Sequence, residues 1–327
     1  MASLVGDMFD PIGNRSIDAE QSTLIRDFLN TIGLSDGSIE TVTVPSSGGS
    51  SGLENQTPFL VPDETTVATA LAPDGEQISI SLNPDSETGK VLVIQGYGDA
   101  LITGGGGSDR VQAGSGDDTV NGGRGDDLVR GGLGSDSLLG GLGDDIIYGN
   151  TGGDTLGAEE GANSLFGGQG EDCISGGIDS DLIMGNRDPD MIDGDSGSDI
   201  IYGNQQDDTV VGGGGQDTLF GGQDNDVLDG GTGDDALHGN LGGDQFVFRT
   251  DSGVDVIYDF VAGTDSILVA TGINGLPVSE PADLAGRISS DAIGNAVIDF
   301  GNGNVVTIDG LSADDLLGNI SSYITVG

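Results

Sequence analysis

The chain of 327 residues carries 55 acidic side chains against 9 basic ones, which gives a formal net charge of −46. A charge of this size excludes nucleic acids and anionic membrane surfaces as partners. Tryptophan is absent and aromatic residues make up 4% of the chain, so a conventional large core is excluded as well. No run of eighteen apolar residues occurs, and we therefore expect no membrane-spanning helix.

Residues 1–52 form the first predicted domain, with an amphipathic helix over residues 16–34 and a Gly/Ser-rich linker over residues 46–52. Asp18 and Gln21 have the spacing of a capping box at the start of this helix. The chain begins without a basic segment followed by an apolar run, so we expect no cleavable signal peptide.

Residues 53–103 are predicted to form a β cap, with strands over 65–72, 78–82 and 91–94. The segment 96–102 looks like one degraded copy of the repeat that follows it, without the aspartate of that repeat. Atypical units of this kind are found at the ends of repeat arrays, where they cover the core.

Sixteen copies of a nine-residue unit follow one another over residues 104–247, without insertion or deletion. Position 1 of the unit is glycine in fourteen copies, with Ala113 and Ala158 as the exceptions, and position 4 is glycine in twelve. Position 6 is aspartate in fifteen copies, with Asn163 as the exception, and position 8 is apolar in all sixteen. The glycines predict tight turns, and position 8 predicts a short strand with one buried face.

Two units make one predicted circuit of eighteen residues, in the order turn, strand, turn, strand. Residues eighteen apart then stack about 4.8 Å apart along the axis, which is the spacing of neighbouring strands. The predicted fold is all-β: a right-handed parallel β-roll solenoid of eight circuits, about 38 Å long, with a short N-terminal helix and β caps at both ends.

The position-6 side chains form two predicted columns, because each lies above the residue eighteen positions away. Carboxylates at this spacing repel one another unless a cation lies between them. Carboxylate and turn-carbonyl oxygens suit Ca²⁺ better than Mg²⁺, which requires a tighter octahedron and keeps its waters. The candidate metal ligands of one column are Asp109, Asp127, Asp145, Asp181, Asp199, Asp217 and Asp235, interrupted by Asn163. The candidate metal ligands of the other column are Asp118, Asp136, Asp154, Asp172, Asp190, Asp208, Asp226 and Asp244.

The nonapeptide pattern resembles the hemolysin-type calcium-binding repeats of the RTX (repeats-in-toxin) family, over 144 of 327 residues. The resemblance implies Ca²⁺ ions between the loops of successive circuits, bound by position-6 aspartates and backbone carbonyls. It allows about fourteen ions, seven per column, with weaker binding beside Asn163. Fourteen ions would bring the charge of −46 to about −18, so we expect calcium binding and folding to be one equilibrium. Altered turns are expected where position 4 lacks glycine, at Asp179, Asp188, Gln206 and Asp224.

The resemblance also implies a route and a location. RTX proteins typically leave the cell through a type I exporter that reads an uncleaved C-terminal signal, so we expect a secreted protein, extracellular or at the cell surface. The segment 244–267 is similar to the part that closes RTX rolls in serralysin-like proteases. Cys173 is the single cysteine, which excludes an internal disulfide.

Residues 248–327 are predicted to form a C-terminal cap. Residues 296–300 and 305–308 predict a hairpin, and residues 311–317 predict a short helix. The apolar tail 320–326 is interpreted both as a last capping strand and as the place of the export signal.

The sequence offers no catalytic constellation. Residues 48–52 match a nucleophile-elbow pattern, but the one histidine, His238, lies in the repeat array, away from that segment. A single histidine also excludes the two-histidine zinc protease motif. We therefore predict no catalytic residues and no enzymatic activity.

The outward positions 7 and 9 differ between odd and even copies of the repeat. In the odd copies they form an apolar stripe along one sheet, about 30 Å long at the strand spacing. A patch of this size on a soluble protein usually marks an interface. Three partners for this stripe are predicted as alternatives: the helix over residues 16–34, about 25 Å long, another copy of the protein in a dimer or a filament, or a foreign partner. The stripe consists of Leu128, Ile146, Tyr148, Phe166, Leu182, Met184, Ile200, Tyr202 and Phe220.

Together these features predict a secreted, non-enzymatic calcium-binding protein whose roll folds on extracellular Ca²⁺. Its expected role is structural, in a cell surface or extracellular matrix, with calcium-dependent self-assembly. One alternative is an adhesion module that binds a polysaccharide or a protein. Another is an accessory fragment of an RTX hydrolase.

Overall fold

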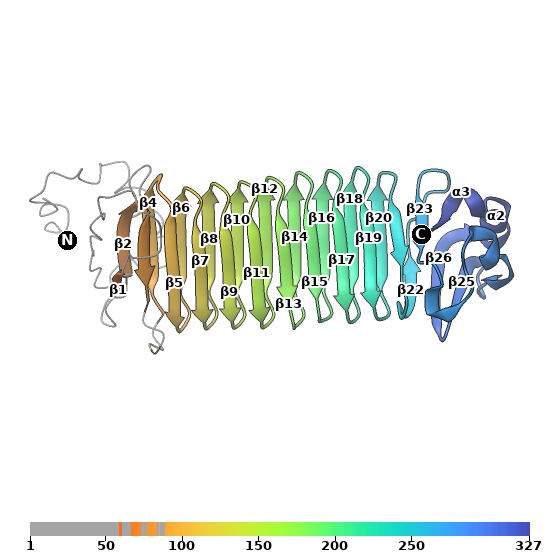
Figure 1. Ribbon diagram of the computed structural model, residues 1–327, viewed down its shortest axis with the longest axis horizontal. Helices are drawn as coiled ribbons and strands as arrows, with labels where there is room; N and C mark the ends of the chain where they lie inside the picture. The colour runs from red at the N-terminus through yellow and green to blue at the C-terminus, as the bar shows by residue number, and fades with distance from the viewer. Residues whose placement is uncertain (1–58, 61–66, 73–76, 83–84, 86–88) are drawn as a thin grey trace, which may run out of the picture.

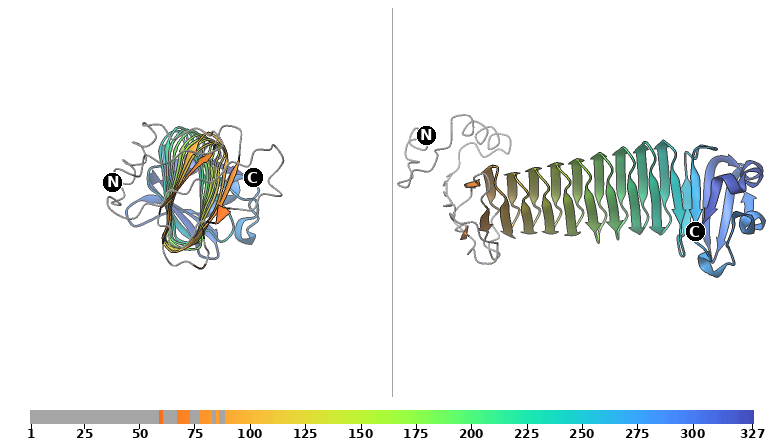
Figure 2. Two further views of the ribbon diagram at one scale, coloured as in Figure 1. Left: turned by 90° about the vertical axis from the view of Figure 1, so that its left-hand side faces the viewer. Right: turned by 45° about the horizontal axis from the view of Figure 1, so that its top comes forward.

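The chain winds into a long solenoid in which successive strands alternate between two facing sheets (Figure 1). The computed structural model describes residues 59–60, 67–72, 77–82, 85 and 89–327. The helix predicted over 16–34 and the linker over 46–52 lie outside the described residues. Seen along its axis, the roll is a flattened tube (Figure 2). The all-β parallel solenoid is confirmed, with about ten circuits.

The strands of the described residues form two sheets. One has thirteen strands, in the order β1 (Phe59–Leu60), β3 (Ile78–Ser81), β5 (Ala100–Gly106), β7 (Thr119–Arg124), β9 (Ser137–Leu142), β11 (Thr155–Glu160), β13 (Cys173–Gly177), β15 (Met191–Asp195), β17 (Thr209–Gly214), β19 (Val227–Thr232), β21 (Gln245–Phe248), β23 (Ser266–Val269) and β27 (Ile324–Val326). The other has fourteen, in the order β2 (Val67–Ala72), β4 (Val91–Gly96), β6 (Arg110–Ser115), β8 (Leu128–Leu133), β10 (Ile146–Thr151), β12 (Ser164–Gln169), β14 (Leu182–Arg187), β16 (Ile200–Gln205), β18 (Thr218–Gln223), β20 (Ala236–Leu241), β22 (Val254–Ile257), β26 (Asn304–Ser312), β25 (Asn295–Gly301) and β24 (Ile288–Ser290). Neighbouring strands are parallel, except in the antiparallel pairs β24–β25 and β25–β26.

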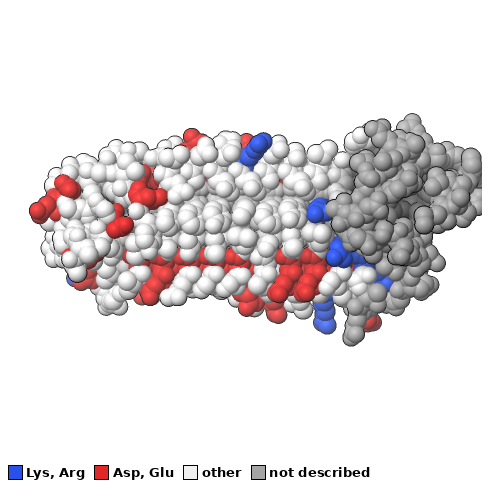
Figure 3. Space-filling view, turned by 180° about the vertical axis from the view of Figure 1, so that it is seen from behind, with Lys and Arg blue, Asp and Glu red and all other residues white. Residues whose placement is uncertain are grey.

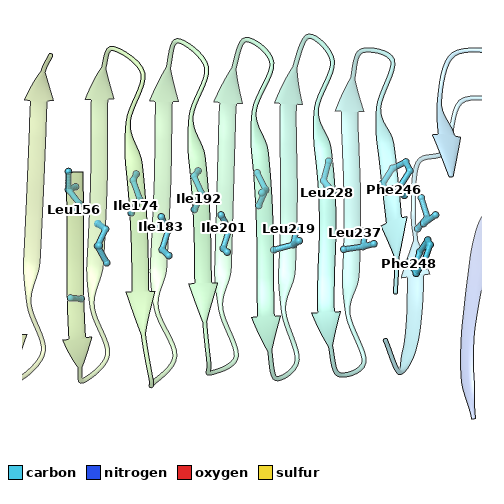
Figure 4. Packing of buried hydrophobic residues seen from close by; sticks show 14 of the residues in the cluster. Leu156, Ile174, Ile183, Ile192, Ile201, Leu219, Leu228, Leu237, Phe246 and Phe248 are labelled. Atoms are coloured by element: carbon cyan, nitrogen blue, oxygen red, sulfur yellow. The ribbon is translucent and has the colours of Figure 1, made fainter. Parts of the chain in front are cut away.

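The pairing register confirms a circuit of eighteen residues. Between β10 and β12, for example, Ile146 lies opposite Ser164 and Tyr148 lies opposite Phe166. The position-8 side chain of every copy, from Val111 to Phe246, lies between the sheets and is at most 2% exposed. Figure 4 shows such side chains, from Leu156 to Phe246, stacked along the inside of the roll. Each strand of the repeat array therefore contributes one large apolar side chain to a narrow, continuous core.

The strands predicted before the repeats are β2, β3 and β4, and they extend the two sheets of the roll. β4 pairs with β6, where Leu92 lies opposite Val111. Ile78, Ile80 and Leu82 are buried, as the alternation of a half-buried strand requires. These strands therefore continue the core beyond the first strict copy.

The C-terminal end closes the roll with a small mixed layer, seen at the far end from β2 in Figure 1. β25 and β26 confirm the predicted hairpin, and α2 (Ala313–Gly318) confirms the short helix. The 3₁₀ helices η2 (Ile273–Gly275) and η3 (Pro281–Arg287) precede them.

The apolar tail divides into α3 (Ile320–Tyr323) and β27. β27 pairs with β23, with Ile324 opposite Ile267, and this pairing confirms a last capping strand. The export signal stays a prediction. Among the described residues, no helix is both long and apolar enough to cross a membrane.

Position 4 of the repeat needs a left-handed backbone, as Gly134 with its φ of 119° illustrates. Asp188, Gln206 and Asp224 take φ values of 70°, 74° and 76° at the same position. The backbone of these turns therefore stays left-handed at position 4, and the expectation of altered turns was wrong for these three residues. The cost is roughly 1–2 kcal/mol for each side chain held in this region.

The core predicts the effect of shortening one position-8 side chain. Ile183 is 0% exposed, so Ile183→Ala should lower the free energy of unfolding by about 2–5 kcal/mol. Leu182→Ala, on the outside of the same strand, should cost much less. Urea unfolding at saturating Ca²⁺ measures both, and equal losses would contradict the assignment of the core.

Candidate calcium-binding columns

The structure places the position-6 side chains in two buried columns at the turns of the roll. All fifteen aspartates are at most 4% exposed, and Asn163 is 2% exposed. From Asp127 onward, the Oδ1 atom of each accepts a hydrogen bond from the backbone N–H of the position-6 residue one circuit earlier. The N···Oδ1 distance is 2.6 Å from Asp109 to Asp127 and 2.8 Å from Asp118 to Asp136. The stacking of candidate ligands expected from the eighteen-residue circuit is therefore present.

The second carboxylate oxygen of these aspartates lacks a protein donor. Among the described residues, the Oδ2 atoms of thirteen of the fifteen are buried and accept no hydrogen bond. A buried carboxylate oxygen without a partner costs free energy, and the cost is largest when the carboxylate is charged. The same unsatisfied atom recurs on both columns, once per unit. A cation at this atom would remove the cost at every level of the roll.

In thirteen copies this oxygen lies over the glycine at position 1. A Cβ atom built on Gly131 would lie 2.0 Å from Oδ2 of Asp136, and one on Gly140 would lie 2.3 Å from Oδ2 of Asp145. These distances are far below van der Waals contact. The glycine at position 1 therefore makes room for the carboxylate, whereas the glycine at position 4 serves the turn.

Asn163 shows what the protein does where a column lacks a carboxylate. Its Oδ1 accepts from the backbone N–H of Asp145 at 2.9 Å, as an aspartate would. Its Nδ2 donates to the carbonyl oxygen of Gly161 at 2.7 Å. The amide thus satisfies itself with a turn carbonyl, at the atom where the aspartates have an unpartnered oxygen. Position 1 of this copy is Ala158, one of the two units without the glycine.

Both columns continue beyond the strict repeats. Asp255 and Asp265 are 2% and 4% exposed. Their Oδ1 atoms accept from the backbone N–H groups of Asp235 at 3.1 Å and Asp244 at 3.0 Å. Sequence reasoning missed them because they follow their column neighbours by 20 and 21 residues. The pairing of β22 and β23 with the roll is the signal that identifies them.

A lysine stands at the other end of one column. The backbone N–H of Lys90 donates to Oδ1 of Asp109 at 2.6 Å, in the same way as the position-6 residues. Lys90 is 3% exposed, and its positive charge lowers the pKa of Asp109 against the larger effect of burial. This column therefore ends in a fixed cation of the protein itself.

Burial raises the pKa of the column aspartates far above that of a free carboxyl. The pKa is about 8 for Asp127, Asp136, Asp190 and Asp226, and about 6 for Asp154. Desolvation is the main cause, and neighbouring carboxylates of the same column add to it for the first four. The columns thus favour a bound proton, or a bound cation, over bare negative charge.

The donor set fits Ca²⁺. Within the residues that the structure describes, no three His, Cys, Asp or Glu side chains are placed to hold one ion. Each ion would instead take column carboxylates together with turn carbonyls, and all of these are hard oxygen ligands. Ca²⁺ accepts such irregular oxygen sets, whereas Mg²⁺ requires a stricter octahedron.

A family model for the RTX calcium-binding nonapeptide repeat matches the chain in overlapping stretches from residue 95 to residue 246. They are residues 95–129, 122–156, 148–183, 175–210, 184–219 and 211–246. A comparison with curated proteins found no match. The chain carries RTX calcium-binding repeats over residues 95–246 and is a calcium-binding repeat protein.

Completing the interrupted column predicts a gain of binding. Asn163→Asp, combined with Ala158→Gly to make room for the carboxylate, should add one or two Ca²⁺ ions per chain and raise the melting temperature at saturating Ca²⁺. Equilibrium dialysis and thermal unfolding measure the two effects. Asn121→Asp adds the same charge at position 9 and should change neither. An unchanged ion count in the double variant would contradict the assignment of the site.

The raised pKa values predict a pH dependence for the calcium-free protein. An unfolded aspartate has a pKa near 3.8, whereas those of the folded columns reach about 6 to 8. Between about pH 4 and pH 8 the folded state therefore binds more protons than the unfolded state. The stability that these protons contribute is fully present below about pH 4 and is lost as the pH rises through 6 to 8. Circular dichroism in chelator from pH 4 to pH 8 tests this. If only repulsion among exposed carboxylates unfolded the chain, the strand signal would be lost near pH 4, where exposed aspartates ionise.

Proposed function

We propose that the chain is a secreted, non-enzymatic calcium-binding protein that serves as a structural component of a cell surface or extracellular matrix. The observation that supports it is the recurring unpartnered Oδ2 of the buried aspartates. The position-6 aspartates Asp109 to Asp244 act as the metal ligands, with Asp255 and Asp265 continuing the columns. The RTX roll is a calcium-binding scaffold and is not itself catalytic.

Calcium concentration decides where such a roll can fold. In the cytosol Ca²⁺ is scarce, and the chain carries a charge of −46 that opposes compaction. Outside the cell, Ca²⁺ neutralises the columns and binding supplies folding free energy. An unfolded chain suits passage through a type I exporter, which would read a signal near the C-terminal end. The folded roll then presents long flat faces, which suit assembly with itself.

A calcium titration of the full chain tests the proposal. In chelator at pH 8, we expect little strand signal in circular dichroism and a radius of gyration approaching the unfolded value of about 65 Å. With about 10 mM Ca²⁺, strand signal should appear and the radius should fall toward the compact value of about 20 Å, remaining larger because the roll is elongated. Mg²⁺ at equal concentration should do neither. A folded chain in chelator at this pH would overturn the proposal.

A further inference from the structure

The two faces of the roll differ sharply in charge. The eight strands β6, β8, β10, β12, β14, β16, β18 and β20 contain no aspartate or glutamate in their 48 residues, although the chain has 55 acidic residues. We call the outward surface of these strands the acid-free face. The opposite sheet carries acidic residues within β11, β15 and β19, namely Glu159, Glu160, Asp193, Asp195 and Asp229. Figure 3 shows a broad face of the roll almost without charged side chains, with acidic residues along its lower margin.

A ladder of stacked side chains runs along the acid-free face. The rings of Tyr148 and Phe166 are 4.8 Å apart, and those of Tyr202 and Phe220 are 4.7 Å apart. His238 continues the second stack, 4.6 Å from Phe220 and 4.8 Å from the ring of Tyr258. The interplanar angles lie between 5° and 14°. The ladder thus reaches two residues farther than the stripe expected from the sequence.

The other uncharged positions of this face are aliphatic, glycine, hydroxyl or amide residues. Ile146 and Ile200 at position 7 are 40% and 44% exposed. Beside the ladder run Asn, Gln and Gly residues of positions 2 and 3, such as Asn204 and Gln205. The charged side chains of the face are three arginines, and one of them, Arg130, lies over the ring of Tyr148 at 5.2 Å. The face is therefore apolar, amide-rich and slightly basic on a strongly acidic molecule.

We infer that the acid-free face is the interface of a homodimer, in which two rolls pack sheet against sheet. Two copies of a polyanion can approach closely only through surfaces that carry no negative charge, and this chain has such a surface. The face measures about 38 Å by 20 Å, from eight strands and six residues per strand. Two copies would bury about 1,500 Å², which lies within the standard range for stable complexes.

The predicted N-terminal helix and a glycan fit the acid-free face less well than a second roll does. A helix is about 10–12 Å across, so the one predicted over residues 16–34 would leave about half of the 20 Å width exposed. A sugar ring stacks on the face of an aromatic ring, but the ring faces here are occupied by their neighbours along the ladder. A second flat sheet contacts the ring edges, the aliphatic row and the amide row together. A two-fold axis near the middle of the face gives a closed, isologous pair.

The dimer rests on the proposed function, because the roll must be folded to present the face. The test therefore uses two readouts in 10 mM Ca²⁺: circular dichroism for folding, and sedimentation velocity from about 1 to 100 µM for mass, in the range of affinity expected for such an interface. We expect twice the 32.7 kDa of one chain. Tyr202→Glu and Phe166→Glu each bury an unpaired charge and should weaken the dimer at least about 100-fold, with the strand signal kept.

Asn121→Glu is the matched control, because Asn121 occupies position 9 on the opposite sheet between Thr103 and Leu139, and the change should leave the mass unchanged. Tyr202→Ser removes the ring without adding charge and keeps the test valid if the glutamate variants fold poorly. A monomer at all concentrations with full strand signal overturns the dimer, whether or not it binds a glycan. A mass that grows without limit overturns the closed pair. A roll that is already folded in chelator contradicts the proposed function, while its mass still decides the interface.

Discussion

A buried carboxylate with one oxygen satisfied and one unsatisfied, repeated every nine residues, is the constraint on which the roll depends. Oδ1 is used by the backbone of the preceding circuit, so the aspartate is part of the structure of the turn. In thirteen of the fifteen aspartates, Oδ2 accepts no hydrogen bond from the described residues, and in most copies it lies against the position-1 glycine. The protein alone therefore leaves the negative charge of these carboxylates without a positive partner in the turn. A hard divalent cation completes it without any change in the path of the chain.

This constraint divides the surface of the repeat array. The candidate ligands occupy the turns, at the two margins of the flattened tube, and the strands between them are left to other tasks. On the strands from β6 to β20, no acidic residue occurs, and stacked rings and aliphatic side chains line the outside. On the opposite sheet, acidic residues such as Glu159 and Asp193 do occur. The roll thus separates cation binding from surface contact, which a small globular core could not do.

The strict period made most of the fold predictable. Eighteen-residue circuits, the buried position 8 and the two aspartate columns all follow from residues that recur in register, and the hairpin of β25 and β26 follows from its turn residues. The period could not reveal Asp255 and Asp265, because insertions after Asp244 break the spacing while strand pairing restores the columns. Tyr258, which stacks on His238, was missed for a similar reason, because it follows His238 by 20 residues. His238 is in register with Phe220, but it was left out because the stripe was defined by apolar residues. The repeat pattern predicted that all glycines serve tight turns. In the structure the position-4 glycine serves the turn, whereas the position-1 glycine lies beneath the carboxylate.

Long-wavelength anomalous diffraction from crystals grown in Ca²⁺ tests whether the aspartate columns bind calcium, because it locates each Ca²⁺ ion independently of any folding signal. We expect two rows of anomalous peaks beside the unpartnered Oδ2 atoms of the position-6 aspartates. In the row along the column from Asp109 to Asp235, we expect the peaks beside Asn163 to be weak or absent. Folded crystals in which the Oδ2 atoms bind only water or protein donors, with no anomalous signal along the columns, would contradict calcium binding by the columns.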